Sequence, residues 1–346
     1  APYNFTMQYF GELISIAVAV SWTFTALFFE FAGKRIGSLS VNLLRLFFAF
    51  FLLGGMLYFT TGSFLPLHAD ASTWLWMSLS GLVGFVFGDL CLFYSYTIIT
   101  ARFAQLFMTL APPFAAFFGW ILLGEKLSFM GFVGMSVTLF GIGISILKKS
   151  QPKNGENTVV AGVSHMAVVT ESPAEKKKSF VGKMMPNVEL HLPVKGVLLG
   201  VGAALGQGFG IVLSKVGMNY YAISAEGTSV VEYIPFAATH MRIISGAIGF
   251  ALIIALTGRI KILRDGVKDK KAMVVTFMGS IFGPFVGVSL SLLAVQNTNT
   301  AVASTIMATT PIIILLPYVL FYKKRVTWVE VAGAVLSVVG VSLFFL

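Results

Sequence analysis

Residues 108–115 read MTLAPPFA, which places two adjacent prolines inside a long apolar run. A second stretch, MATTPIII at 307–314, again carries a proline four residues after a methionine, and the two methionines lie 199 positions apart. Proline lacks the N–H that would bond the carbonyl four residues earlier, so each stretch predicts a break in a helix. The recurrence of this break at a fixed offset indicates two related halves.

The sequence around these stretches is that of an integral membrane protein. Of its 346 residues, 57% are hydrophobic and 11% are charged, and the mean hydropathy is +0.87. A helix needs about 20 apolar residues to cross a membrane, whereas a spanning barrel would show short segments of alternating polarity. We therefore predict an all-α membrane protein with ten transmembrane helices. They lie at 10–31, 39–61, 74–97, 103–123, 127–147, 196–217, 236–258, 272–294, 301–322 and 326–346.

The loops between the predicted helices differ in charge. Those after the odd-numbered helices carry a net charge of +14, and those after the even-numbered helices carry −3. Basic residues concentrate in the cytoplasmic loops of membrane proteins. We therefore expect a multi-pass protein of the plasma (inner) membrane, embedded in the lipid bilayer, with both termini outside. Because this topology explains the basic residues, they do not predict nucleic-acid binding.

A polar, lysine-rich segment at 148–195 separates two sets of five predicted helices. Its composition is typical of a flexible linker, and the charge pattern places it in the cytoplasm. An odd number of helices per copy turns the second copy over, so we predict two inverted five-helix repeats, 1–147 and 196–346. Three glycine pairs have GxxxG spacing, which favours close helix packing: Gly84 and Gly88, Gly283 and Gly287, and Gly206 and Gly210. The offset of 199 also relates four pairs of glycines between the halves. These are Gly84 with Gly283, Gly88 with Gly287, Gly134 with Gly333, and Gly141 with Gly340.

The end of each repeat carries a recognisable pattern. Residues 101–147 read ARFAQLFMTLAPPFAAFFGWILLGEKLSFMGFVGMSVTLFGIGISIL, and 300–346 form a looser copy in which the GEKLS turn is replaced by KKRVT. With these residues the chain resembles the EamA-type transporters of the drug/metabolite transporter superfamily, over about 9–147 and 196–346. The resemblance implies a ten-helix carrier whose central cavity is lined mainly by the first, third and fourth helices of each half. It does not imply one substrate.

The prolines mark helix kinks at Pro112, Pro113 and Pro311. A carbonyl freed inside a membrane needs another partner, so broken helices tend to line a pathway. The alternative is a structural kink whose carbonyls bond neighbouring side chains such as Thr310. The residues that we expect to line a central cavity beside the kinks are Met108, Thr109, Met307 and Thr309.

Asp89 is the only acidic residue near the middle of a predicted helix. A carboxylate inside a membrane is costly, which by default indicates a function. Because Arg45 lies at nearly the same depth, the two residues form either a buried ion pair or a site for proton coupling or substrate contact. Arg242 matches Arg45 in the second half, where Val288 replaces the acid. Its guanidinium suits a carboxylate or phosphate, or else it snorkels to the interface.

Further polar and aromatic residues complete a set that suits a small amphipathic solute, although each aromatic residue alone is more typical of packing. They are Trp22, Gln207, Tyr94, Gln105 and Asn297. Three other acids, Glu12, Glu30 and Glu330, lie within two turns of predicted helix ends, so we expect them to contact water.

These features predict a secondary active transporter that moves a small metabolite by alternating access, with export of an amino-acid-like solute as the leading case. A proton-coupled exporter of cationic drugs is the alternative if Asp89 is unpaired and accessible. Outside carriers, the alternative is a membrane-embedded sensor or enzyme. The expected partners are lipid and a small-molecule substrate, with protons as the coupling ion in the cationic case.

The sequence offers little support for catalysis. It contains no P-loop, HExxH or GxSxG motif, and its four histidines are scattered. Cys91 is the only cysteine, which excludes an intramolecular disulfide and a cysteine-rich metal site. We therefore expect no enzyme activity, no cofactor and no bound metal.

Overall fold

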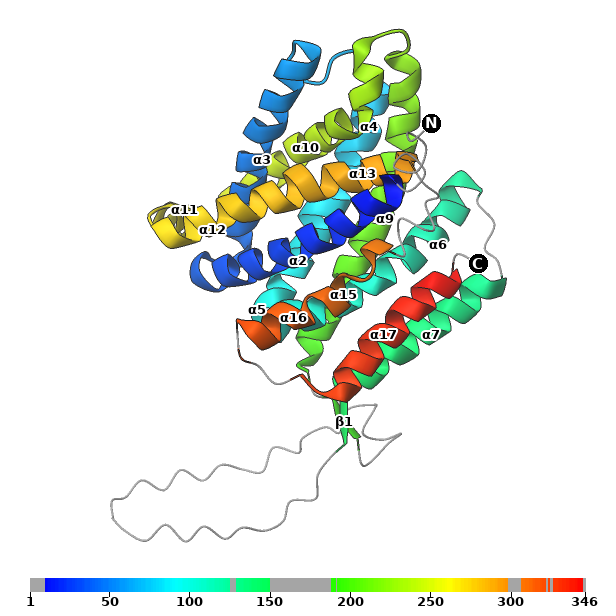
Figure 1. The fold of residues 1–346 in the computed structure, drawn as a ribbon. Helices are drawn as coiled ribbons and strands as arrows, with labels where there is room; N and C mark the ends of the chain where they lie inside the picture. The colour runs from blue at the N-terminus through cyan, green and yellow to red at the C-terminus, as the bar shows by residue number, and fades with distance from the viewer. Residues whose placement is uncertain are drawn as a thin grey trace, which may run out of the picture. The chain divides into compact units, whose positions relative to one another are not determined.

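The computed structural model describes residues 10–124, 129–149, 188–190, 192–297, 306–321, 323 and 326–344. The chain forms two compact units, Ala1–Ser145 with Leu192–Leu346, and Ile146–His191. The described elements of the first unit are all helical (Figure 1). The second unit contains two short strands, which are described last.

The first half of the chain begins with α2 (Phe10–Ile36) and α3 (Ser38–Thr61). A long helical run follows, made of α4 (Ala71–Ser80), the π-helix η1 (Gly81–Asp89), α5 (Leu90–Phe107), the 3₁₀-helix η2 (Met108–Leu110) and α6 (Ala111–Leu123). The last helix of this half is α7 (Phe129–Ile146). Within α5, Thr100 has a φ of 69° and a ψ of 159°, so it separates the segments predicted at 74–97 and 103–123.

The second half begins with α9 (Val194–Ser224), the 3₁₀-helix η3 (Ser229–Tyr233) and α10 (Ile234–Leu256). A short helix, α11 (Ile260–Val267), leads to α12 (Lys270–Ser280), the π-helix η4 (Ile281–Gly287) and α13 (Val288–Asn297). The chain then forms α15 (Thr310–Ile313), α16 (Leu315–Leu320) and α17 (Trp328–Phe344).

Six of the described helical segments are long and apolar enough to cross a membrane. One of them, Ala71–Leu123, is 53 residues long and contains the break at Thr100. Three shorter apolar helices lie at Phe129–Ser145, Thr310–Leu320 and Trp328–Leu343. The chain is therefore a multi-pass membrane protein, whereas the full count of ten spans stays a prediction.

The third predicted helix of each half begins and continues in the same way. Asp70 caps α4 by accepting the backbone N–H of Thr73 at 2.8 Å, and Asp269 caps α12 by accepting that of Ala272 at 3.1 Å. Hydrogen bonds hold the pKa of both carboxyls below the usual value, from the Thr73 hydroxyl to Asp70 and from Arg35 to Asp269. Each of these helices then continues into a π-helix, η1 or η4. The local structure thus repeats with the sequence.

The halves pack on each other reciprocally. The first helix of the second half, α9, packs against α4, η1 and α5, and the first helix of the first half, α2, packs against α12, η4 and α13. The Ser80 hydroxyl donates to the Gly210 carbonyl at 2.6 Å, and the Ser21 hydroxyl donates to the Phe282 carbonyl at 2.6 Å. Reciprocal contacts of this kind between first and third helices are what two structurally related halves produce when a pseudo-two-fold axis relates them.

The last helices of the two halves, α7 and α17, lie side by side (Figure 1). The Thr138 hydroxyl donates to the Ser337 carbonyl at 3.3 Å, and the Ser337 hydroxyl donates to the Thr138 carbonyl at 3.5 Å. These residues are 199 positions apart, the same offset that relates the prolines. A Cβ at Gly141 would lie 2.5 Å from the Ser337 nitrogen, and one at Gly340 would lie 2.4 Å from the Thr138 nitrogen. Equivalent residues thus meet each other at this contact.

Glycines allow η1 and α9 to cross at backbone distance. A Cβ at Gly206 would lie 2.7 Å from the Cα of Gly88, and one at Gly210 would lie 2.8 Å from the Cα of Gly84. Side chains cannot occupy these positions unless the helices move apart, because the obstructing atoms are backbone. The close packing predicted from the GxxxG spacing is confirmed here.

This crossing predicts a difference between two neighbouring glycines of α9. Gly206→Ala should lower the free energy of unfolding by about 1–3 kcal/mol, because the added methyl meets the backbone of Gly88. Gly202→Ala should be neutral or slightly stabilising, since its Cβ would lie 3.5 Å from the Cys91 sulfur and alanine favours helix. Thermal unfolding of the two purified variants makes the comparison. Equal melting temperatures would contradict the close crossing.

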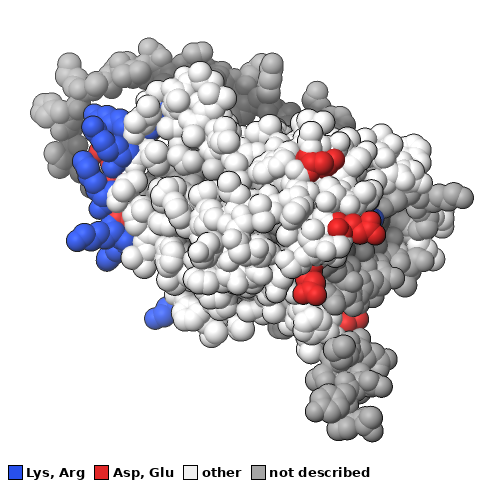
Figure 2. Space-filling view, turned by 90° about the horizontal axis from the view of Figure 1, so that it is seen from above, with Lys and Arg blue, Asp and Glu red and all other residues white. Residues whose placement is uncertain are grey.

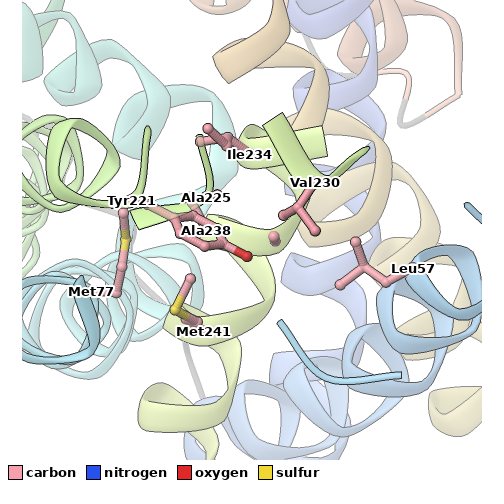
Figure 3. Packing of buried hydrophobic residues seen from close by; sticks show 9 residues of the cluster. Leu57, Met77, Tyr221, Ala225, Val230, Ile234, Ala238 and Met241 are labelled. Atoms are coloured by element: carbon pink, nitrogen blue, oxygen red, sulfur yellow. The ribbon is translucent and has the colours of Figure 1, made fainter. Parts of the chain in front are cut away.

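A buried apolar cluster joins both halves near the loop between α3 and α4. Figure 3 shows how side chains from α3, α4, α9 and α10 pack together in this cluster. The members of this cluster are Leu57, Met77, Tyr221, Ala225, Val230, Ile234, Ala237, Ala238 and Met241. The Tyr221 hydroxyl, at its edge, donates to the Leu67 carbonyl at 2.7 Å, so the loop is tied to the cluster.

Charged side chains separate on the face of the molecule that Figure 2 shows, with Lys and Arg at one end and carboxylates mostly at the other. Basic residues lie in the last turn of α2, at Lys34 and Arg35, and in the segment 259–271. Arg35 pairs with Asp269 at 2.8 Å, which ties α2 to the start of α12. This separation agrees with the loop charges, and the sidedness of the linker and termini stays a prediction.

The second compact unit corrects one expectation for the linker at 148–195. Its described residues form an antiparallel pair of strands, β1 (Leu147–Lys149) and β2 (Val188–Leu190), in which Lys148 lies opposite Glu189. Residues 150–187 lie outside the described part. The linker therefore begins and ends in a short ladder, which composition alone did not predict.

Candidate functional site

A buried ion pair lies between α3 and η1. Arg45 and Asp89 form a hydrogen-bonded salt bridge whose side chains are 4% and 7% exposed. Asn42 supports both partners, because its Oδ1 accepts the Arg45 Nε–H at 3.1 Å and its amide donates to the Asp89 carbonyl at 3.3 Å. Burial of either charge alone would be costly, so the partners stabilise each other. The ion pair, one of the alternatives that the similar depths left open, is present.

Gln207 connects this ion pair to the second half. Its side-chain amide donates to Oδ1 of Asp89 and, at 3.2 Å, to the carbonyl of Gly84. A Cβ at Gly88 would lie 3.2 Å from the backbone nitrogen of Gln207. The close crossing at the glycines therefore brings the side-chain amide of Gln207 within reach of Asp89. Asp89 therefore accepts with both carboxylate oxygens, one from each half of the chain.

Arg242, on α10, lies beside the ion pair without joining it. The residue is 4% exposed, and its Nε has no hydrogen-bond partner among the described residues. Its guanidinium carbon lies 4.6 Å from the centre of the Phe85 ring, and that of Arg45 lies 5.3 Å from the same ring. Both Asp89 and Arg45 act on Arg242 electrostatically. Two buried guanidiniums thus lie near one carboxylate that pairs with only Arg45, and the burial of Arg242 does not fit the snorkelling alternative.

Two further predicted residues lie in the interior near other partners. Trp22 packs in the second crossing of first and third helices, where a Cβ at Gly287 would lie 2.8 Å from the indole nitrogen. Gln105 is 8% exposed and donates to the Tyr96 hydroxyl at 2.7 Å. The contacts of Trp22 and Gln105 thus do not include the Asp89 cluster.

Tyr94 and Asn297 are not part of the cluster as described. Tyr94 is 40% exposed, and its hydroxyl accepts from Lys195 at 2.8 Å, so it lies at the surface near the start of α9. Asn297 is the last residue of α13, and its side chain lies outside the described part of the chain.

The prolines begin new helical segments. Pro112 and Pro113 lie in the first turn of α6, and Pro311 lies in the first turn of α15. The Met108 carbonyl accepts the Ala111 N–H, and the Met307 carbonyl accepts the Thr310 hydroxyl at 2.8 Å. Two of the freed carbonyls are therefore satisfied locally, as in the structural alternative.

The four residues expected to line a cavity beside the kinks differ in burial. Thr109 is 1% exposed and Met307 is 6% exposed, whereas Met108 and Thr309 are half-buried. Pro311 instead lines a small pocket together with Arg102 and Glu330. A central cavity at the four residues stays a prediction.

Glu30 was expected in water, and this expectation is wrong because the residue is 3% exposed. Its carboxylate accepts the Ala101 N–H at 3.0 Å, accepts the hydroxyl of Tyr318 and pairs with Lys34. Ala101 follows the break at Thr100, where a helix begins and its first N–H groups need acceptors. Glu30 thus caps this helix and links the first half to α16.

Glu330 was also expected in water, and its side chain is 14% exposed. It forms an ion pair with Arg102, with 3.1 Å between Nη1 and Oε2. The Arg102 guanidinium also lies 4.5 Å from the centre of the Phe103 ring. A second contact between the halves therefore lies close to that of Glu30. The only sequence signal for this contact was Arg102, which lies in the loop between the helices predicted at 74–97 and 103–123.

Metal binding was not expected, and within the described residues no group of three or more His, Cys, Asp or Glu side chains is placed to hold an ion. The single cysteine, Cys91, is a partly buried free thiol.

The helices and their reciprocal packing define a multi-pass membrane transporter fold, and comparison with known families identifies which one. A profile of the EamA-like transporter family matches residues 9–147 and 194–346. The chain belongs to the EamA-like transporter family, within the drug/metabolite transporter superfamily. Members of this family are transporters, which supports the expectation that the chain is not an enzyme.

The comparison with solved structures supports the fold and says nothing of the function. Sixteen chains match, and one of them, titled "Crystal structure of protein", shares 15% identity with a TM-score of 0.56 over 97% of this chain and 96% of that chain. A comparison with curated protein sequences finds no match.

Proposed function

We propose that the protein is a secondary active transporter that moves a small amino-acid-like metabolite out of the cell by alternating access. The observation that carries this proposal is the buried cluster of Arg45, Asp89 and Gln207, which joins the two halves inside apolar helices. Ionisable residues inside a membrane protein typically mark a substrate or ion pathway. In carriers with inverted repeats, that pathway lies where the repeats meet.

The link between Asp89 and Gln207 suits a movement of one half against the other. It is a single pair of side chains between η1 and α9, whereas the ion pair with Arg45 lies within the first half. A rocking movement would separate the first pair and leave the second intact. The polar groups so released would face the solute and cavity water at the site where the helices part.

The same cluster disfavours the proton-coupled exporter of cationic drugs. That alternative needs an unpaired and accessible acid, whereas Asp89 is 7% exposed and has both oxygens engaged. The cluster also carries one more positive than negative charge, counting Arg242. A cation would be repelled by this excess, and an amino acid could present its carboxylate to it.

Counterflow into proteoliposomes tests the proposed function. Vesicles loaded with one amino acid at a time are diluted into the same labelled amino acid, with ethidium as the cationic comparison. We expect transient accumulation of at least one amino acid and none of ethidium, relative to protein-free vesicles. Ethidium flux that depends on a pH gradient, without amino-acid flux, would favour the cationic alternative.

A further inference from the structure

We propose that Arg242 binds the carboxylate of the transported solute, because it is the guanidinium of the cluster that forms no salt bridge among the described residues. This inference rests on the proposed function and names the chemical group that the site recognises. The hydrogen bonds of Asp89 and Asn42 support this inference, because they join these acceptors to donors other than Arg242.

Asp89, the acid that acts on Arg242 electrostatically, directs both carboxylate oxygens to other donors. One oxygen of Asp89 accepts from Arg45 and the other accepts from Gln207, while the Asn42 Oδ1 accepts from Arg45 at 3.1 Å. Among the described residues, no acid forms a salt bridge with Arg242, and its buried Nε lacks a hydrogen-bond partner. The guanidinium carbon of Arg242 lies 4.6 Å from the centre of the Phe85 ring.

An uncompensated guanidinium is costly to bury. An aromatic face attracts a cation, but it offers no acceptor for the N–H groups. A carboxylate offers two oxygens that match the guanidinium fork, and it neutralises the excess charge of the cluster at the same time. A carboxylate ligand would therefore supply Arg242 with hydrogen-bond acceptors and with a compensating negative charge.

The two halves differ at this point. Arg45 has an acid in the third helix of its own half, and the matching position in the second half is Val288, which cannot pair with Arg242. The guanidinium of Arg242 packs closely against the backbone of Gly84, where a Cβ would lie 3.0 Å from its Nη2 atom. Arg45 thus pairs within the protein, whereas Arg242 is available to bind a ligand.

Thermal unfolding of purified protein without added solute gives the first part of the test. Arg45→Gln should lower the melting temperature, because it removes the partner of Asp89. Arg242→Gln should leave the melting temperature unchanged or raise it, because it removes a buried positive charge that forms no salt bridge. A fall in Arg242→Gln as large as that in Arg45→Gln, including failure to fold, would show a structural role and overturn the proposal.

Matched pairs of probes give the second part. Leucine with leucinamide, threonine with threoninamide, and phenylalanine with phenylalaninamide keep the ammonium group and differ in the carboxylate. At least one acid should raise the melting temperature of the wild type, and its amide should not. Arg242→Lys should weaken binding of that acid about tenfold, since it keeps the charge and loses the fork. Equal shifts with acid and amide, or an acid shift that survives in Arg242→Gln, would overturn the proposal.

A footprint of the wild type needs no variant. Movement of the halves should let phenylglyoxal reach Arg242 in the solute-free protein, and mass spectrometry should show that the acid that binds slows this modification and its amide does not. No modification of Arg242 without solute would contradict access of a solute to it. Arg35, whose side chain is 43% exposed, reports unspecific effects. Protection by acid and amide alike contradicts carboxylate recognition.

These results are separable from failure of the carrier. Acid binding through Arg242 without counterflow of any solute would keep the binding site and remove the proposed function. Counterflow of acids and amides at the same rate would keep the carrier and remove the role of Arg242.

Discussion

Asp89→Asn is expected to lower the free energy of unfolding by about 3 kcal/mol, the order of cost of breaking a buried ion pair. The amide keeps the shape of the side chain and still accepts from Gln207, so packing changes little. What is lost is the negative charge that acts on both Arg45 and Arg242. Two guanidiniums then remain buried in an apolar interior without an acid.

The double variant Asp89→Asn with Arg45→Gln should recover part of this loss, because it leaves one guanidinium unpaired instead of two. Chemical unfolding of the wild type, both single variants and the double variant gives the interaction energy directly. Asp70→Asn, at an exposed helix cap, controls for the general effect of replacing an acid. A loss in Asp89→Asn no larger than in this control would contradict the buried pair.

Glu30→Ala is the second change with a large expected effect. It leaves the Ala101 N–H, the Tyr318 hydroxyl and Lys34 without their shared acceptor. A hydrogen bond to a charged group contributes about 1.5–3 kcal/mol, and Glu30 is 3% exposed, so we expect a loss of about 3 kcal/mol or more.

Tyr318→Phe is the matched control because it removes one of these contacts and keeps the capping of Ala101. Its loss should be about 1–2 kcal/mol, clearly smaller than that of Glu30→Ala. Thermal and chemical unfolding in one detergent measure both. If Tyr318→Phe costs as much as Glu30→Ala, the carboxylate is not the centre of this contact.

Several features of this molecule follow from local rules. The helices follow from apolar runs of membrane-spanning length, and the interruptions follow from Pro112 and Pro311, whose rings and missing N–H groups act on their own segment. Arg45 and Asp89 could be paired from depth alone, because two opposite charges inside a membrane have few other ways to be stabilised.

Other features depend on the packing of distant segments. Gln207 reaches Asp89 because glycines let two helices cross at backbone distance, and the sequence contains the glycines without saying which helices cross. Glu30 lies close enough to a helix end to be expected in water, yet Tyr318, 288 positions away, covers it. The two π-helices were not predicted, and the break at Thr100 carries no proline or glycine to signal it.

The role proposed for the charged cluster at the contact of the two halves is in transport as well as in stability. Counterflow by proteoliposomes that hold the Asp89→Asn with Arg45→Gln variant tests it most directly, because the variant removes the pair without stranding Arg45. Measured with the amino acid that the wild type accumulates, and at matched amounts of folded protein, counterflow should be lost. A wild-type rate with an unchanged pH profile would contradict this role and leave the ion pair as a structural contact.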